Sequence, residues 1–225
     1  KTDGTVNSVF EPGFPGNPIS GGSGHILLSF GGNFVLDSAL NSGIGNISLL
    51  IGGDLTLKED GDLITQGGTL DIDVGGDLTM DDGAVGSTKG GNIRVETGGQ
   101  LSLSSLDTSS QEGNGDISII AGSIVDGGDA HKDIIGSGLR LDVIEGAGEG
   151  NNALDIEGDL LSARVGSGGL VLSEEDSITF GIVQPVIVNR VAADGTSSEL
   201  ADDEAQEGIV SSASGHIIVT AQADI

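Results

Sequence analysis

The sequence predicts an all-β fold: a parallel β-helix, or solenoid, with about 23 residues in each coil. Three observations support this prediction. Similar short segments recur at steps near 23 residues, as in GGDLTL at 52–57 and GGDLTM at 75–80. Each segment alternates apolar with mostly polar residues, which is the period of a β-strand. Glycines with Asp or Asn separate the segments, where turns need backbone angles that other residues disfavour.

A first strand is expected in every coil, beginning one or two residues after a glycine. Its copies are expected at 26–28, 47–49, 70–72, 93–95, 117–119, 139–141, 170–172 and 217–219. The steps between their first apolar positions are therefore 21, 23, 23, 24, 22, 31 and 47, and the last two contain insertions. Equivalent positions should stack into inward columns of branched aliphatic side chains. One column runs through Ile47, Leu70, Ile93 and Ile117, and the next through Leu49, Ile72, Val95 and Ile119.

A second strand is expected about eight residues after the first. Its copies are expected at 33–36, 54–57, 77–80 and 100–103, with weaker ones at 123–124, 154–156 and 177–180. A third apolar spot follows at 63–64, 84–85 and 134–135. In the second strand Thr56, Thr79 and Ser102 should face outward as a ladder of hydroxyls. Asp54 and Asp77 begin their strands, where their carboxylates can accept hydrogen bonds from turn amides.

Residues 1–20 do not fit the repeat and are expected to cap the first coil or to contact a neighbouring subunit. The stretch EPGFPGNP at 11–18 holds three of the four prolines. A flexible linker is the alternative. Phe10 and Phe14 favour a contact, because a linker seldom contains two phenylalanines.

Residues 21–225 are expected to form the β-helix, with insertions near 145–153 and 192–208. Within the second insertion, 198–208 predicts one short helix, N-capped by Ser198 and ended by Gly208. The last residues, 223–225, resemble a strand cut in mid-coil. We therefore expect that the chain belongs to a longer array or that the next subunit covers this end. The residues expected to mediate assembly are Phe10, Phe14, Ile217, Val219 and Ile225.

Composition limits the partners. The formal net charge is −27, from 8 Lys and Arg against 35 Asp and Glu. This disfavours nucleic acid and anionic lipid, which both need a basic surface. No apolar stretch reaches the roughly 18 residues that span a bilayer, so membrane insertion is not expected. The chain has no Trp and no Tyr, so its core must be aliphatic.

Two acidic turns are candidates for a metal site. Glu59, Asp60 and Asp62 follow one repeat, and Asp81 and Asp82 follow the next. Their carboxylates, with turn carbonyls, can form a low-affinity Ca²⁺ site, and Ca²⁺ is the one candidate cofactor. The alternative is a solvated, salt-bridged turn in which Lys58 lies between Asp37 and Asp81.

The sequence gives little indication of catalysis, and we expect that the protein is not an enzyme. Outward candidates are Asp71 beside Arg94, with Arg140 further along. Since Asp71 and Arg94 are one repeat apart, an ion pair explains them simply. The histidines are far apart in sequence, and His25 and His216 are expected at the same turn position of distant coils. The sequence contains no Ser-His-Asp arrangement, phosphate loop or His/Cys metal spacing.

The coil segments resemble those of filamentous-haemagglutinin-type adhesins and related giant repetitive bacterial surface proteins. The resemblance covers about 21–225, and it is carried by 45–57, 150–156, 160–172 and 176–180. It implies a right-handed parallel β-helix, export, and an extracellular or cell-surface location. It is specific for architecture and weak for function, because such coils occur in many proteins.

Two functions are therefore compared. The first is a structural β-helical segment of an extracellular bacterial adhesin or fibre, associating end to end with copies of itself or with adjoining repeats of a longer chain. The second is a carbohydrate-binding or polysaccharide-acting β-helix protein with surface glycans as partners. The near absence of aromatic residues counts against the second function, because sugars stack on exposed aromatic rings.

Overall fold

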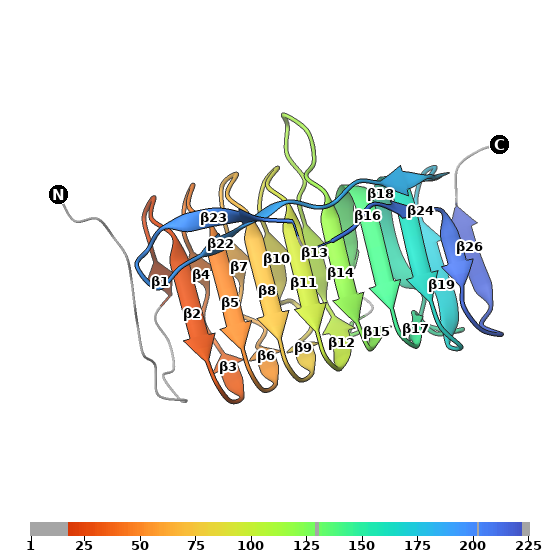
Figure 1. Cartoon of the computed structure of the whole chain (residues 1–225), viewed down its shortest axis with the longest axis horizontal. Coiled ribbons are helices and arrows are strands. Elements are labelled where there is room, and N and C mark those ends of the chain that lie inside the picture. Colours follow the sequence, from red (N-terminus) through yellow and green to blue (C-terminus); the bar gives the residue numbers. More distant parts are fainter. Residues whose placement is uncertain (1–17, 129–130, 202, 222–225) are drawn as a thin grey trace.

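The computed structural model describes residues 18–128, 131–201 and 203–221, and within them it is all-β. Parallel strands stack coil upon coil into a β-helix, so the prediction of the fold class is confirmed (Figure 1). Successive coils pair Ile26 with Ile47, then Leu70, Ile93 and Ile117, which gives the predicted steps of 21, 23, 23 and 24 residues.

The coils have three walls. Wall A contains β2 (Ile26–Phe30), β5 (Ile47–Ile51), β8 (Leu70–Val74), β11 (Ile93–Thr97), β14 (Ile117–Ala121), the later parts of β16 (Ile134–Val143) and β18 (Leu154–Val165), then β20 (Thr179–Phe180) and β25 (Ile209–Ser211). Wall B contains β3 (Phe34–Leu36), β6 (Leu55–Leu57), β9 (Leu78–Met80), β12 (Gln100–Leu103), β15 (Ser123–Asp126), β17 (Gly146–Ala147), β19 (Gly169–Glu174) and β26 (Ile217–Ala221).

Wall C is the narrowest. It contains β1 (Ile19–Ser20), β4 (Leu40–Asn41), β7 (Leu63–Ile64), β10 (Val85–Ser87), β13 (Ser105–Asp107), the first parts of β16 and β18, and the last parts of β19 and β26. Four further strands leave the coils and pair only with one another: β21 (Ile182–Val183) with β24 (Gln206–Glu207), and β22 (Val188–Val191) with β23 (Ser197–Leu200). No helix in the described part of the chain is long and apolar enough to cross a membrane.

The interior is aliphatic, as the composition predicts. The predicted column Ile47, Leu70, Ile93 and Ile117 is fully buried, and so are its wall B counterparts Leu55, Leu57 and Leu101. Branched side chains suit a parallel sheet whose inner face is sealed from water. Thr56 stacks on Thr79, and Thr79 on Ser102, on the outer face of wall B, so the outward hydroxyl ladder is confirmed.

The predicted role of the strand-starting aspartates is also confirmed. Asp54 Oδ1 accepts a hydrogen bond from the Asp77 amide at 3.0 Å, and Asp77 Oδ1 accepts one from the Gln100 amide at 2.8 Å. One coil earlier, Asn33 Oδ1 accepts a hydrogen bond from the Asp54 amide at 2.9 Å. Each side chain thus satisfies a corner amide of the next coil, where no ladder hydrogen bond is available.

A second ladder of hydroxyls lies inside the corner between walls C and A, and the sequence analysis missed it. Ser42, Thr65, Thr88 and Thr108 are fully buried. Thr65 Oγ1 donates to the Gly68 carbonyl at 2.7 Å, and the others donate to Gly45, Gly91 and Gly115 in the same way. Gly68 is required here because a Cβ would lie 1.9 Å from the Gly45 carbonyl oxygen of the previous coil.

The predicted strand positions are wrong in the last coils. Leu170 pairs with Ala147 and Ile217 pairs with Leu170, so both belong to wall B, and wall A continues from Leu139 to Leu161. Strand 154–156 lies on wall C and 177–180 contributes to wall A, so neither is a second strand. Consequently His25 precedes wall A while His216 precedes wall B. The physical reason is that β16 and β18 run from wall C into wall A without the turn that marks each earlier coil.

The predicted helix over 198–208 is also wrong. Ser197–Leu200 is β23, which pairs antiparallel with β22: Leu200 lies opposite Val188, and Ser197 lies opposite Val191. Leu200 and Ala201 are the only apolar residues near the start of that segment, too few for a buried helix face. Pairing with the valine-rich β22 instead covers Leu200, so tertiary contacts override a helix cap signal. Near the other predicted insertion, β17 belongs to wall B, and an isolated antiparallel bridge joins Glu149 to Asn152 after it.

Substituting Thr65→Val should lower the free energy of unfolding by about 1–2 kcal/mol, because the buried Gly68 carbonyl loses its donor while the volume stays the same. Thr56→Val, on the outer ladder of the same coil, is the matched control and should change it by less than about 0.5 kcal/mol. Chemical denaturation of both variants measures the difference. Equal effects would contradict the assigned role of the inner ladder.

Candidate functional site: a charged sheet face beneath a strap

A column of polar side chains runs along the outer face of wall A. Adjacent coils pair Ser48 with Asp71, Asp71 with Arg94, and so on through Ser118, Arg140 and Ser162. These six residues, here called the polar column, are at most 3% exposed. Outward-facing charges are normally solvated, so something must cover this face.

The cover is formed by residues 181–201 and 203–208, here called the strap. Figure 1 shows the strap leaving the C-terminal coils and running back across wall A, so that β22 and β23 lie over β2, β5 and β8. Its contacts follow that path in order. The Ile187 carbonyl accepts from Asn92 Nδ2, the Asn189 amide donates to Thr69 Oγ1, and the Val191 amide donates to Ser48 Oγ. Ser197 Oγ reaches Asn46 and His25 in the first coils.

Arg190 fixes the outgoing limb of the strap. Its Nε and Nη2 atoms lie 2.7 and 3.2 Å from the two oxygens of Asp71, and Nη2 lies 3.0 Å from Asp73. This fork on a carboxylate is the strong, geometrically specific form of an ion pair. The hydrogen bond to Asp71 raises the pKa of Arg190, and burial only partly opposes it.

Arg94 and Arg140 hold the returning limb. Arg94 Nε lies 3.6 Å from Asp203 of the strap, and Nη1 lies 3.5 Å from Asp71. Burial lowers the pKa of Arg94, but the hydrogen bond to Glu96 and the charges of Glu96, Asp203 and Asp71 outweigh it, so the net pKa is raised. Further on, Arg140 Nε donates to the Glu204 carbonyl at 3.1 Å. Gln206 Nε2 donates to the Leu141 carbonyl at 2.8 Å.

Apolar contacts complete the docking. Val183, Val186, Val188 and Val191 of the strap are at most 2% exposed. Burying four valines supplies several kcal/mol, which helps offset the desolvation of the charges. The arrangement is therefore a closed interface between the coils and their own strap, and its charges are occupied by ion pairs.

The sequence predicted part of this site. The ion pair between Asp71 and Arg94 is confirmed, and Arg140 lies on the same face. The sequence reasoning missed Arg190, Asp203 and Gln206, because they lie more than 60 residues from their partners and outside the repeat. The available signal was the valine-rich run 183–191, which contains a basic residue and follows no coil pattern.

The structure does not bring the five metal candidates into one cluster. Lys58 Nζ lies 3.0 Å from Asp81, as the salt-bridge alternative expected. Asp82 lies 3.4 Å from His131 Nδ1. Asp62 Oδ1 accepts from the Val85 amide at 3.0 Å, and burial raises its pKa despite that bond. Glu59 packs against Gly83, and Asp60 lies near Asp62. Within the described ranges no three His, Cys, Asp or Glu residues are grouped to hold a metal ion.

The assembly candidates are only partly described. Phe10, Phe14 and Ile225 lie outside the described residues. Ile217 and Val219 lie on β26, in register with Leu170 and Leu172. Val219 packs against the core, whereas Ile217 is 45% exposed although it occupies an inward position.

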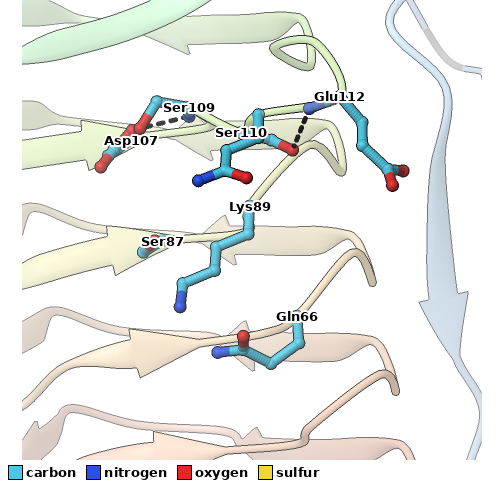
Figure 2. Close-up of a pocket in the computed structure, with 8 residues that line it drawn as sticks. Gln66, Ser87, Lys89, Asp107, Ser109, Ser110 and Glu112 are labelled. Atoms are coloured by element: carbon cyan, nitrogen blue, oxygen red, sulfur yellow. Dashed lines mark hydrogen bonds between the residues drawn. The ribbon is translucent and has the colours of Figure 1, made fainter.

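A polar groove of about 720 Å³ lies on the corner between walls C and A (Figure 2). The corner turns before it have five residues (42–46, 65–69 and 88–92), but 108–116 has nine and forms one side of the groove. Hydrogen bonds from the Ser109 amide to Asp107 and from the Glu112 amide to Ser110 order this loop. The lining residues are Gln66, Ser87, Lys89, Asp107, Ser109, Ser110, Gln111 and Glu112.

Lys89 is unusual in two respects. Its φ is +51°, and it is the only non-glycine residue with a positive φ in the described part of the chain. That conformation costs about 1 kcal/mol for a residue with a Cβ. Among the described lysines and arginines, Lys89 is also the one that forms no ion pair. Figure 2 shows its side chain between Ser87 and Gln66, so its ammonium group is open to a ligand.

Asp133 is a buried carboxyl under wall C. It is fully buried, and its Oδ2 accepts from the Asp155 amide at 2.7 Å. Burial raises the pKa of Asp133 to about 8, and the charges of Asp126 and Asp155 add to this effect. At neutral pH this carboxyl is therefore largely protonated.

Comparison with known proteins gives no match: no protein-family model, no curated protein and no solved structure is significantly similar to this chain.

Replacing Arg190 by Met should lower the free energy of unfolding by about 2 kcal/mol, because buried Asp71 then keeps only its longer contact with Arg94. The matched control is Arg164→Met. Arg164 is half exposed and lies 3.9 Å from Asp142, so less than about 0.5 kcal/mol is expected. Denaturation midpoints give the comparison, and an Arg190 variant as stable as the control would show that the strap does not depend on this pair.

Asp133 should make stability fall as pH rises. The folded chain retains the Asp133 proton up to about pH 8, whereas an unfolded aspartate loses its proton near the ordinary aspartate pKa of 3.8. The contribution of Asp133 to the free energy of unfolding therefore decreases from about pH 4 to about pH 8, and it stays constant above pH 8. Asp133→Asn should remove this decrease and raise the melting temperature at pH 9 relative to the parent. Exposed Asp159→Asn controls for loss of one surface charge, and parallel melting profiles of parent and Asp133 variant would refute the assignment.

Proposed function

We propose that this chain is a structural β-helical segment of an extracellular bacterial adhesin or fibre, and that it associates end to end with neighbouring copies or adjoining repeats. One observation carries the proposal. The aliphatic interior continues to β26, where inward-facing Ile217 is still 45% exposed. An inward position that is open to water needs another coil above it.

The last strands of walls A and B support the same proposal. Phe180, Val210, Ile217 and Ile218 are between 45% and 52% exposed, on β20, β25 and β26. These strands are also at the edge of the described stack, so their outer main-chain groups can pair with a further strand. Exposed apolar side chains beside unpaired strand edges are typical of an interaction surface.

The sides of the rod have the opposite character. The formal net charge is −27, and acidic side chains such as Asp54, Glu59 and Asp60 are exposed at the turns, so like charges oppose lateral contact between copies. Attraction at the ends and repulsion along the sides favour linear association. The strap suits this role because it connects the first coils to the last through side-chain contacts.

Ile217→Asp should abolish end-to-end association, because a carboxylate at an inward position cannot be buried against another coil. Ile144→Asp is the control: Ile144 is 78% exposed on the side of the rod, and its substitution should leave association unchanged. Sedimentation velocity and electron microscopy of concentrated protein measure the difference. Monomeric particles of the parent protein at high concentration would overturn the proposed assembly.

A second function, carbohydrate binding, is favoured by the groove in Figure 2. Amides, hydroxyls, carboxylates and one ammonium group line it, and these are the groups that hydrogen-bond sugar hydroxyls. Since the molecule carries a strong negative charge, a neutral oligosaccharide fits better than a polyanion. The groove has no aromatic lining residue, so weak binding is expected.

Lys89→Ala should weaken binding of neutral oligosaccharides at least about tenfold, since it removes a hydrogen bond from a charged donor. Lys58→Ala, whose ammonium is occupied by Asp81, should leave it unchanged. Ligand-observed NMR titration against an oligosaccharide panel measures both. Equal affinities of the two variants, or no binding by the parent, would remove this second function.

A further inference from the structure

The strap joins the coils through a narrow neck. It begins at Gly181 and ends at Gly208, and the Gly208 amide donates to the Gly181 carbonyl at 2.9 Å. Gly208 has φ +64°, and nothing lies within 4 Å of where its Cβ would be. Both glycines are bonded to neighbouring positions of β18, Gly181 to Leu161 and Gly208 to Ala163. The two ends of the strap therefore leave wall A side by side, at a site with the conformational freedom of a hinge.

The strap can leave wall A without breaking the coil ladders. In the described structure its four strands pair only with each other, in two antiparallel pairs. Arg190, Val191 and Ser197 are held by side chains of the coils: Asp71 and Asp73, Ser48, and Asn46. A strap from another copy would find the same partners in the same order.

The polarity of the strap restricts how such an exchange can be built. The strap runs from the C-terminal coils toward His25, with its turn over the first coils. The same contacts can form on a second molecule only if its C-terminal coils face those of the first. Two copies related in this way share an isologous contact, and exchange of an identical element between them is a low-cost route to a dimer.

We propose that the polar column is the docking surface for the strap of a second copy of this chain, so that two copies joined at their C-terminal coils exchange straps reciprocally. Docking contacts are equal in number in the closed and exchanged forms. The difference is that Phe180 and Ile217, which lie at inward positions over Leu161 and Leu170, become buried between the two coils, and this burial offsets the entropy of association. This inference deepens the proposed end-to-end function, on which it rests, by naming the ends and the element that links them.

Charge makes a second copy the suitable occupant. Wall A offers Asp71 of the polar column and its neighbour Asp73 as acceptors, and Arg94 and Arg140 of the column as donors. The strap presents the complement in the same order along its length: Arg190 toward the acidic pair, then Asp203 and the Glu204 carbonyl toward the two arginines. Such alternation of sign along one face selects register as well as partner.

A cysteine cross-link tests the exchange directly, since the chain contains no cysteine. Asn46 Nδ2 and Ser197 Oγ lie 3.3 Å apart, so Asn46→Cys with Ser197→Cys places one thiol on the coils and one on the strap. After equilibration over a range of protein concentrations, the double variant is oxidised and run on a non-reducing gel. While monomer predominates, the ratio of disulfide-linked dimer to internally linked monomer should rise about tenfold for a tenfold rise in concentration.

Mixing the two single variants gives an independent measurement. A dimer linked between position 46 of one copy and 197 of the other, identified by mass spectrometry, supports the exchange. The pair Ser48→Cys with Val191→Cys repeats the test if the first pair oxidises poorly, because the Val191 amide lies 2.9 Å from Ser48 Oγ. Internally linked monomer alone, at all concentrations and with both pairs, would overturn the exchange. Filaments seen together with that result would leave the end-to-end function intact and remove only the strap exchange.

Discussion

The coil-to-coil register is the constraint on which the structure depends. Main-chain pairing places each residue over its equivalent one coil earlier, from Ile26 over Ile47 through to Leu139 over Leu161. Every property of a position is thereby repeated. Aliphatic positions become a continuous core, Asp54 and Asp77 become a chain of corner acceptors, and Ser48 to Ser162 become one polar column. A change in one coil therefore acts on its two neighbours as well.

The strap pairs the charges that the register stacks on the outer face of wall A. Stacking Asp71, Arg94 and Arg140 on one face concentrates charge, and burying that charge is favourable only when each group is paired. Arg190, Asp203 and the strap's main chain supply those partners from outside the repeat. The same contacts join coils that are otherwise connected only to their nearest neighbours, which makes the rod more cooperative than a simple solenoid.

The sequence was sufficient for the fold wherever the repeat is regular. Gly45, Gly68 and Gly91 mark a close approach between coils, so they located each wall A strand up to Leu139. After that point β16 and β18 lack the corner turn, and the glycine landmark led to Leu170 and Ile217 being placed on the wrong wall. The candidate site was only half predictable. Asp71 and Arg94 are one coil apart, but Arg190 meets them through a long-range contact that no local period encodes.

Hydrogen exchange of the strap amides tests most directly whether the strap is docked on wall A through its own main chain. The amides of Asn189 and Val191 donate to Thr69 and Ser48, whereas the turn residues 192–196 project beyond the paired part of the hairpin. Residue-resolved exchange should therefore show the amides of 188–191 protected by at least about a hundredfold relative to an unstructured chain. Exchange of 188–191 at the rate of an unstructured chain, while the coils remain protected, would contradict this docking.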